Sequence, residues 1–194
     1  IAEAAKAEAP SVWDTLSDEE KSARLAKVQS DAEKLNVSVM PVSAEDDRLK
    51  ISVLNGAAEF GDEQLLLFEP VSERIAVLDL AKSQVTDEGL KVLATMRELE
   101  KLHLENTKIT DSGIQHLTPL KKLEYLNLYS TSVSNAIFDY IKDIPSLRKV
   151  YVWQTKVDTQ EARKFEKSVN LEINTGIDLE QAAAEAKAKN EAEA

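Results

Sequence analysis

The sequence contains no cysteine, which excludes disulfide bonds, thiolate metal sites and cysteine nucleophiles. It also lacks any apolar run near the roughly 18 residues that a membrane-spanning helix needs, and its first residues do not have the charged-then-apolar pattern of a leader. We therefore expect no membrane insertion. Because the chain begins at Ile1 rather than at methionine, we expect a processed product or a fragment of a longer protein.

Positive charge is in deficit. The chain of 194 residues carries 24 Lys and Arg against 35 Asp and Glu, a net charge of -11. Nucleic-acid binding depends mainly on basic side chains that displace counterions from phosphates, so this acidic balance argues against a nucleic-acid partner. The length is sufficient for one domain with a sizeable core.

What the sequence does contain is a motif that recurs four times, at steps of 24 residues, over 75–85, 99–109, 123–133 and 147–157. In the third copy the apolar positions are Leu123, Leu126, Leu128 and Val133, and a small polar residue, Thr131, precedes the last of them. This spacing is typical of leucine-rich repeats, in which each repeat packs only on its neighbours. It predicts an α/β fold, a right-handed solenoid of parallel strands backed by short helices.

Each strand is followed by a turn and then by apolar residues at helical spacing. We expect this convex layer to hold Leu90, Leu93, Met96, Ile114, Leu117, Leu120, Phe138, Ile141, Ile144, Ala162, Phe165 and Val169. At the turns we expect helix N-caps at Asp87, Asp111, Asn135 and Thr159. One carboxylate per turn is too few for calcium. We expect the hydroxyls of Ser83, Thr107, Thr131 and Thr155 to bond to the backbone of neighbouring turns.

The sequence on either side of the repeats predicts how the solenoid is closed. Ser17 and Glu20 have the spacing of a capping box, which predicts a helix to about Leu35 with an apolar stripe of Leu25, Val28, Ala32 and Leu35. Two strands, 37–40 and 49–54, follow, with an acidic turn between them. We divide the chain into a linker (1–16), an N-terminal cap with a degenerate first repeat (17–74), four repeats with a truncated closing strand (75–174) and an Ala/Glu/Lys-rich tail (175–194).

Two sequence segments, 85–90 and 109–114, resemble the bacterial, ribonuclease-inhibitor-like class of leucine-rich repeats. More narrowly, 123–129 and 149–157 resemble the last repeats of the leucine-rich domain in planctomycete-type cytochrome c proteins. That resemblance covers roughly 37–174. It implies a protein-binding role beside a haem domain, a periplasmic or secreted location, and a haem protein as partner. The haem-attachment motif is missing, so we expect no cofactor, and the residues by themselves suit the cytoplasm equally well.

Outward residues of successive repeats stack in columns in a parallel sheet. The columns are Val77, Lys101, Tyr125, Lys149; then Asp79, His103, Asn127, Tyr151; then Ala81, Glu105, Tyr129, Trp153. We call the outward residues of one strand a rung. Aromatic residues are only 5% of the chain, yet four of its six Tyr and Trp residues fall on the last two rungs, in the third and fourth copies of the motif. Rigid amphipathic rings of this kind dominate binding hot spots. The sequence therefore predicts a partner-binding face at Tyr125, Asn127, Tyr129, Lys149, Tyr151, Trp153, His103 and Glu105.

The residues leave three different roles open beside this one. In the first, the aromatic residues only pack on the sheet, because aromatic side chains suit exposed strand positions. In the second, the solenoid is a spacer or assembly subunit that contacts partners through its ends. In the third, the aromatic rungs bind carbohydrate. Asp79 and Glu105 around His103 predict a charge cluster suited to a basic partner. An open sheet offers no water-excluding pocket, so we expect no catalytic site.

Overall fold

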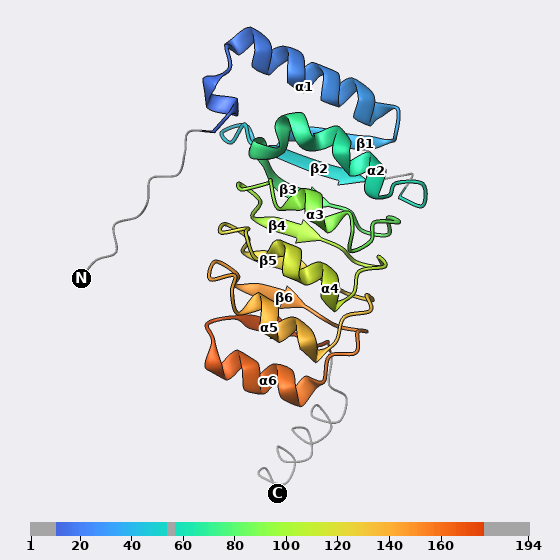
Figure 1. Ribbon diagram of the computed structural model, residues 1–194, viewed down its shortest axis with the longest axis vertical. Coiled ribbons are helices and arrows are strands. Elements are labelled where there is room, and N and C mark those ends of the chain that lie inside the picture. Colours follow the sequence, from blue (N-terminus) through green and yellow to red (C-terminus); the bar gives the residue numbers. More distant parts are fainter. Residues whose placement is uncertain (1–10, 54–56, 177–194) are drawn as a thin grey trace, which may run out of the picture.

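The computed structural model describes residues 11–53 and 57–176, and its elements stack in chain order along one axis (Figure 1). The strands are β1 (Val37–Pro41), β2 (Leu49–Val53), β3 (Ile75–Asp79), β4 (Lys101–His103), β5 (Tyr125–Asn127), β6 (Lys149–Tyr151) and β7 (Glu172–Asn174). The α-helices are α1 (Asp18–Glu33), α2 (Asp62–Leu65), α3 (Leu90–Leu93), α4 (Asp111–Ile114), α5 (Phe138–Ile141) and α6 (Thr159–Ser168). The 3₁₀ helices are η1 (Trp13–Thr15), η2 (Leu66–Arg74), η3 (Gln115–Leu117) and η4 (Asn135–Ile137).

The strands form one sheet in the order β1 to β7. β1 runs antiparallel to β2, and every later pair is parallel. Leu78, Leu102, Leu126 and Val150 lie opposite one another in register, which confirms the repeat and the solenoid. β7 pairs with β6 as the predicted closing strand.

The apolar positions of the motif form one continuous core. Leu78, Leu102 and Leu126 are completely buried, as are the helical residues Leu90 and Ile114. One prediction is wrong in its register: Ile137 is fully buried in the third full repeat, whereas Phe138 is only half-buried. The Phe138 ring instead stacks on Phe165 with centroids 4.7 Å apart, so it joins α5 to α6.

The predicted N-caps are wrong: the N-cap of α3 is Gly89, two residues after Asp87, and the other three are displaced by one position. The N-cap residues of α4, η4 and α6 are Thr110, Ser134 and Asp158, and each uses its own side chain to accept a backbone N–H of the helix that follows. Thr159 is the first residue inside α6.

The aspartates instead join consecutive repeats. Asp87 Oδ1 accepts the Thr110 N–H at 2.8 Å, and Asp87 Oδ2 accepts the Thr110 hydroxyl at 2.5 Å. The same pair of bonds recurs between Asp62 and Thr86 and between Asp111 and Ser134, and Asn135 accepts the Asp158 N–H at 2.8 Å. We call this column of inter-repeat contacts the turn ladder. Asp62 therefore extends the turn ladder into the stretch before β3, where we predict a degenerate repeat.

The buried hydroxyls serve the backbone, but within their own repeat. Thr107 donates to the Leu104 carbonyl and Thr131 to the Leu128 carbonyl, each at 2.7 Å. The prediction that they bond to neighbouring turns is therefore wrong. The three threonine hydroxyls, including that of Thr155, each satisfy a carbonyl three residues earlier, where the strand bends into the turn. The Ser83 hydroxyl oxygen instead accepts the Val85 N–H at 3.4 Å.

The segment before the first full repeat contains a helix and two strands, α1, β1 and β2, and it differs from the prediction in two places. The Ser17 hydroxyl accepts the Glu20 N–H, and the Glu20 carboxylate accepts the Ser17 N–H at 2.9 Å, so the capping box is present. The helix ends at Glu33, however, and Leu35 is 37% exposed rather than part of the buried stripe.

The second difference is at residues 11–16, which pack on the fold rather than forming part of a linker. The Ser11 hydroxyl and the Trp13 N–H both donate to Glu73 Oε2 at 2.8 Å. The linker residues 1–10 and the tail residues 177–194 lie outside the described part of the chain.

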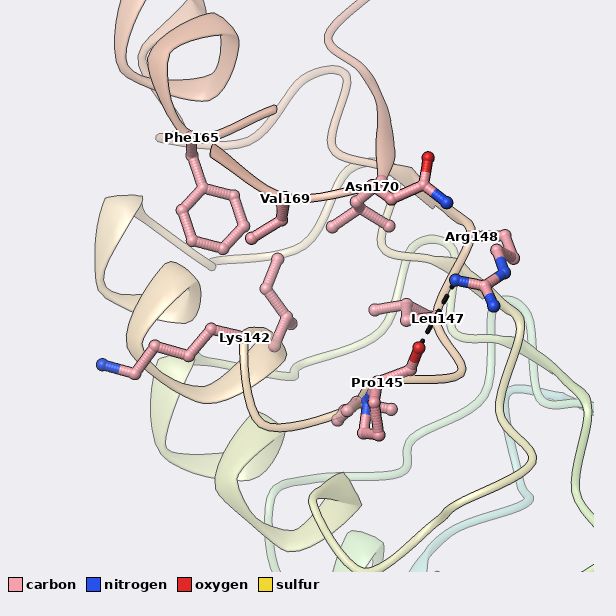
Figure 2. A pocket seen from close by; sticks show the side chains of 10 residues that line it. Lys142, Pro145, Leu147, Arg148, Phe165, Val169 and Asn170 are labelled. Atoms are coloured by element: carbon pink, nitrogen blue, oxygen red, sulfur yellow. Dashed lines mark hydrogen bonds between the residues drawn. The ribbon is translucent and has the colours of Figure 1, made fainter. Parts of the chain in front are cut away.

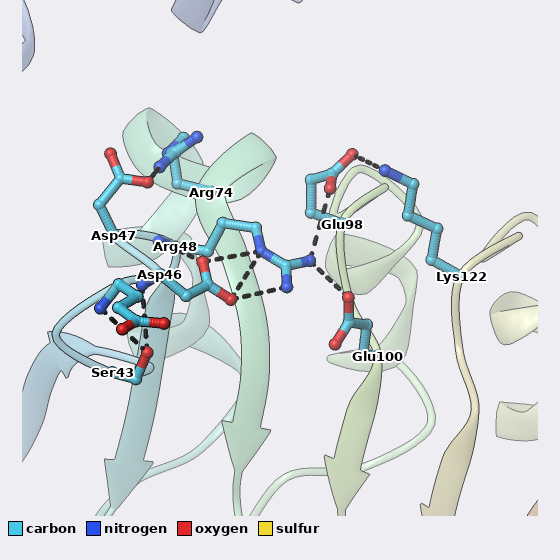
Figure 3. A network of polar contacts seen from close by, with 9 residues as sticks. Ser43, Asp46, Asp47, Arg48, Arg74, Glu98, Glu100 and Lys122 are labelled. Carbon is cyan, nitrogen blue, oxygen red and sulfur yellow. Dashed lines mark hydrogen bonds and ion pairs between the residues drawn. The ribbon is translucent and has the colours of Figure 1, made fainter.

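An ion-pair network locks the β1–β2 hairpin to the first full repeats, at the edge of the sheet where the strands begin (Figure 3). Arg48 lies between Asp46, at 2.7 Å, and Glu100, at 2.5 Å. Glu98 joins Arg48 to Lys122, which precedes β5. The Arg48 guanidinium also holds the pKa of Asp46 below its usual value. The predicted acidic turn is therefore a structural clamp.

Both free edges of the described sheet receive a side chain from the terminal helix beside them. At the N-terminal edge, Gln29 of α1 donates to the Val39 carbonyl of β1 at 3.3 Å. At the C-terminal edge, Glu166 of α6 accepts the Ile173 N–H of β7 at 2.9 Å. Occupied edge groups are less available for strand-by-strand association.

Candidate functional site

The predicted face exists as a set of adjacent rungs on the open side of the sheet. Tyr125 lies opposite Lys101 on one side and Lys149 on the other. His103, Asn127 and Tyr151 are likewise in register. The strands bring all eight predicted site residues onto consecutive rungs because the step between copies is constant at 24 residues. Their role in binding stays a prediction.

The aromatic rings of the face contact one another in two groups. The His103 and Tyr125 ring centroids lie 4.9 Å apart, and those of Tyr125 and Tyr151 lie 5.4 Å apart. A second pair, Tyr129 and Trp153, lies 5.3 Å apart, as the column alignment predicts. All three pairs are tilted, by 37° to 46°, a geometry in which ring edges approach ring faces. We call these five rings the aromatic cluster.

Trp153 is the most exposed large side chain of the cluster, at 46%. The indole of Trp153 contacts the Tyr129 ring of the preceding repeat, and the backbone of Gly176, in the following segment, also lies against the indole. Gly176 has φ +89, and a Cβ there would collide with the Trp153 indole at Cδ1, so a side chain is excluded. The sequence analysis assigns Gly176 to the tail and so does not predict it as part of the site. Its position could have been predicted from the pairing of Asn174 with Tyr151, because Gly176 follows Asn174 by two residues, as Trp153 follows Tyr151.

The acidic rung predicted around His103 is bonded internally. Glu105 Oε1 lies 3.0 Å from His103 Nδ1 and accepts the Asn127 amide at 2.5 Å. Asn127 in turn accepts the Tyr129 N–H, and Asp79 accepts the Ala81 N–H, both at 3.1 Å. Glu105 Oε2 is buried and has no hydrogen-bond partner among the described residues. These carboxylates therefore organise the face and present little accessible negative charge.

Two titratable groups of the face respond to their surroundings. Burial, with the neighbouring Tyr151 phenol as a second cause, raises the pKa of Tyr125 above 10.0. The hydrogen bond with Glu172, 2.7 Å away, raises the pKa of Lys149, whose ammonium also lies 5.3 Å from the Tyr151 ring centroid. Contacts among residues of β5, β6 and β7 therefore fix the side chains at the C-terminal end of the face.

A hollow near the C-terminal end lies away from the face, on the helical side between α5 and α6 (Figure 2). Its volume is about 240 Å³, and apolar side chains including Ile141, Phe165 and Val169 line it. Arg148 at its rim donates to the Pro145 carbonyl at 3.4 Å. None of the eight predicted site residues lines it.

Within 11–53 and 57–176, no three His, Asp or Glu side chains are grouped so that they could hold a metal ion. Over the same residues, no helix combines the length and apolar character that crossing a bilayer requires.

The comparisons with known proteins agree on the repeat. A sequence profile described as Leucine Rich repeat matches residues 76–94 and 96–117. No curated protein matches the sequence. The actin-binding site 2 domain of leiomodin-1 superposes with a TM-score of 0.52 at 17% identity, over 95% of this chain and 99% of that one.

Two bacterial structures overlap more partially. A leucine-rich-repeat protein of Leptospira interrogans gives a TM-score of 0.39 at 18% identity, over 55% of this chain and 33% of that chain. An internalin of Listeria monocytogenes gives 0.35 at 18% identity, over 55% of this chain and 43% of that chain. The profile match over these two segments and the register of the strands support a leucine-rich-repeat solenoid as the fold.

Proposed function

We propose that this leucine-rich-repeat chain is a non-catalytic module that binds another protein on its open sheet face, chiefly through the aromatic cluster. The observation that carries the proposal is the placement of Tyr129 and Trp153, in ring contact with each other and, for Trp153, 46% exposed, where the equivalent residues of earlier rungs are Glu105 and Ala81. Clustered aromatic side chains are the groups that contribute most to protein interfaces.

Pure sheet packing explains less of this arrangement. Ring packing accounts for His103, Tyr125 and Tyr151, which cover one another. It does not account for a large indole left half open to solvent beside a glycine whose positive φ leaves room for it. Nearly half of the Trp153 side chain lies outside these contacts, so packing explains only part of the reason for a tryptophan there.

Carbohydrate binding on the aromatic rungs and docking through the ends of the solenoid have less support. Stacking on a sugar requires an open ring face, whereas the indole of Trp153 has Tyr129 on one side and Gly176 against it on the next rung. Docking strand by strand at the ends requires free edge groups, whereas Gln29 and Glu166 each bond to an edge backbone group. The open face is thus the better supported contact surface.

The leiomodin-1 domain with this fold is described as an actin-binding site, which supports protein binding as a use of the fold. An extracytoplasmic location and a haem-protein partner are predictions from sequence resemblance alone. The absence of an enzymatic role rests on the openness of the face, where His103 and Glu105 pair without an enclosed substrate pocket beside them.

The test is a comparison of variants in partner capture. The immobilised wild-type chain and the variant Trp153→Ala/Tyr129→Ala are exposed to an extract of the source organism, and bound proteins are identified by mass spectrometry. Tyr140→Ala, an aromatic deletion on the helical side, is the matched control. We expect at least one protein captured by wild type and control and lost from the double variant. Retention by the double variant would reject the aromatic cluster as the binding site.

A further inference from the structure

The first column of the face carries three lysines and one glutamate, in a chain whose net charge is -11. Lys50 of β2 lies opposite Val77, and Val77 lies opposite Lys101, so the column reads Lys50, Val77, Lys101, Tyr125, Lys149 and Glu172. Lys50 and Lys101 are both exposed, and within the described residues neither has a carboxylate within ion-pair distance. Lys50 is not among the site residues that the sequence predicts.

The carboxylates in the described columns are used by the chain itself. Glu105 accepts bonds from Asn127 and lies against His103, Asp79 accepts a backbone N–H, and Glu172 pairs with Lys149. Glu105 and Asp79 are also half-buried. The face therefore offers a ligand two ammonium groups without a carboxylate partner, whereas the carboxylates of the columns already have partners within the chain, which is the reverse of the predicted preference for a basic partner.

The spacing of the lysines defines the charge pattern that fits them. Neighbouring strands are about 4.8 Å apart, so Lys50 and Lys101, two rungs apart, are separated by about 10 Å along the column. An extended chain rises about 3.3 Å per residue, so carboxylates three residues apart repeat at this distance. The aromatic cluster lies alongside, where it can receive an apolar side chain of the same segment.

We propose that the open face binds an acidic, extended segment of a partner protein, with carboxylates at every third residue on Lys50 and Lys101 and an apolar side chain on the aromatic cluster. The inference rests on the proposed function, since it names the chemistry of the partner at that site. Exposed ion pairs contribute modest affinity individually but set the sign of charge that a surface accepts.

The probe is a fluorescently labelled peptide of about 12 residues, with Glu at every third position and Leu, Gly and Ser elsewhere, long enough to cross the strands of the face. Matched peptides carry Gln or Lys in place of Glu. Binding is measured by fluorescence anisotropy at about 50 mM salt, where charge interactions are weakly screened. The test variant is Lys50→Glu/Lys101→Glu; Lys121→Glu/Lys167→Glu makes the same charge change outside the columns.

We expect wild type and the control variant to bind the Glu peptide about tenfold or more tightly than the Gln peptide, and Lys50→Glu/Lys101→Glu to lose that preference. Absence of binding by the Glu peptide, equal binding of the Gln peptide, or a preference for the Lys peptide would overturn the inference. If Trp153→Ala/Tyr129→Ala still abolishes capture of the native partner in that case, the proposed function stands. A Glu preference that needs both lysines but ignores Trp153 and Tyr129 would instead reject the aromatic cluster.

Discussion

The turn ladder and the open sheet face follow the same 24-residue step, and they use it in opposite ways. In the ladder the same contact is made again at each step, from Asp62 to Thr86, from Asp87 to Thr110 and from Asp111 to Ser134. On the face the equivalent residues differ at each step, as in the column Ala81, Glu105, Tyr129 and Trp153.

The difference separates folding from recognition. Each repeat packs only on its neighbours, so a contact that holds one pair of repeats must be supplied again for the next pair. Repetition is therefore the mark of a structural role. A face that recognises one partner has no reason to repeat, because each rung meets a different part of that partner.

The largest effect should come from the core beneath the face. Leu126 is completely buried, and its replacement by Ala should lower the free energy of unfolding by about 2 to 5 kcal/mol, through lost burial and a residual cavity. The neighbouring Tyr125→Ala removes a half-buried ring and should cost clearly less. Urea unfolding measures both. Equal losses would mean that the face is as structural as the core.

The turn ladder should come next. Asp87→Ala removes the acceptor of the Thr110 N–H and hydroxyl, and we expect a loss of about 2 to 3 kcal/mol, since bonds to a charged group are among the stronger ones. Asp87→Asn keeps an acceptor for the N–H, as Asn135 does for Asp158, and should cost about half as much. Thermal unfolding of the three chains checks the order. An Asp87→Ala variant as stable as wild type would remove the ladder as a source of stability.

A substitution at Gly113 tests the turn ladder by placing an added side chain against Asp87. Its φ is negative and helical, so an alanine should fit the backbone, but the added Cβ would collide with Asp87 Oδ1. We expect Gly113→Ala to cost about 1 to 3 kcal/mol through this clash. In the Asp87→Ala background most of that cost should vanish, because the clashing oxygen is gone. Additive losses in the double-mutant cycle would contradict the ladder geometry.

The smallest effect concerns the Tyr125 phenol. Its pKa in the folded chain should lie above 10.0, because burial and the Tyr151 phenol both disfavour the phenolate. The neutral form is therefore favoured in the folded state, and any stability that it contributes is lost as pH rises through the raised pKa. Tyr151→Phe should lower the pKa of Tyr125 only in part, since burial remains. Carbon-13 NMR titration of Tyr Cζ measures it; a value at or below 10.0 would show a solvated ring.

The sequence is informative wherever a contact repeats and less so wherever it does not. The leucine positions, the strand register and the Tyr129–Trp153 contact follow from a constant step. The predicted N-cap position is displaced because Thr110 and Asp111 are adjacent and both suit a cap, and only the three-dimensional partner of the aspartate separates their roles.

The remaining differences lie at the ends of the solenoid, where the step changes. Asn174 pairs with Tyr151 after 23 residues rather than 24, so Gly176 falls outside the predicted columns. Lys50 is missed because the predicted columns begin at Val77. The contacts of Ser11 and Trp13 with Glu73 join segments about 60 residues apart, and no local pattern encodes them.

The most direct test sets the two regions against each other, by measuring the melting temperature and the partner affinity of Asp87→Ala and of Trp153→Ala/Tyr129→Ala. The account predicts a crossed result: Asp87→Ala melts at a lower temperature and binds the partner as wild type does, whereas the double variant melts nearly as wild type and loses the partner. A double variant that loses stability and keeps its partner would contradict the assignment of recognition to the open face.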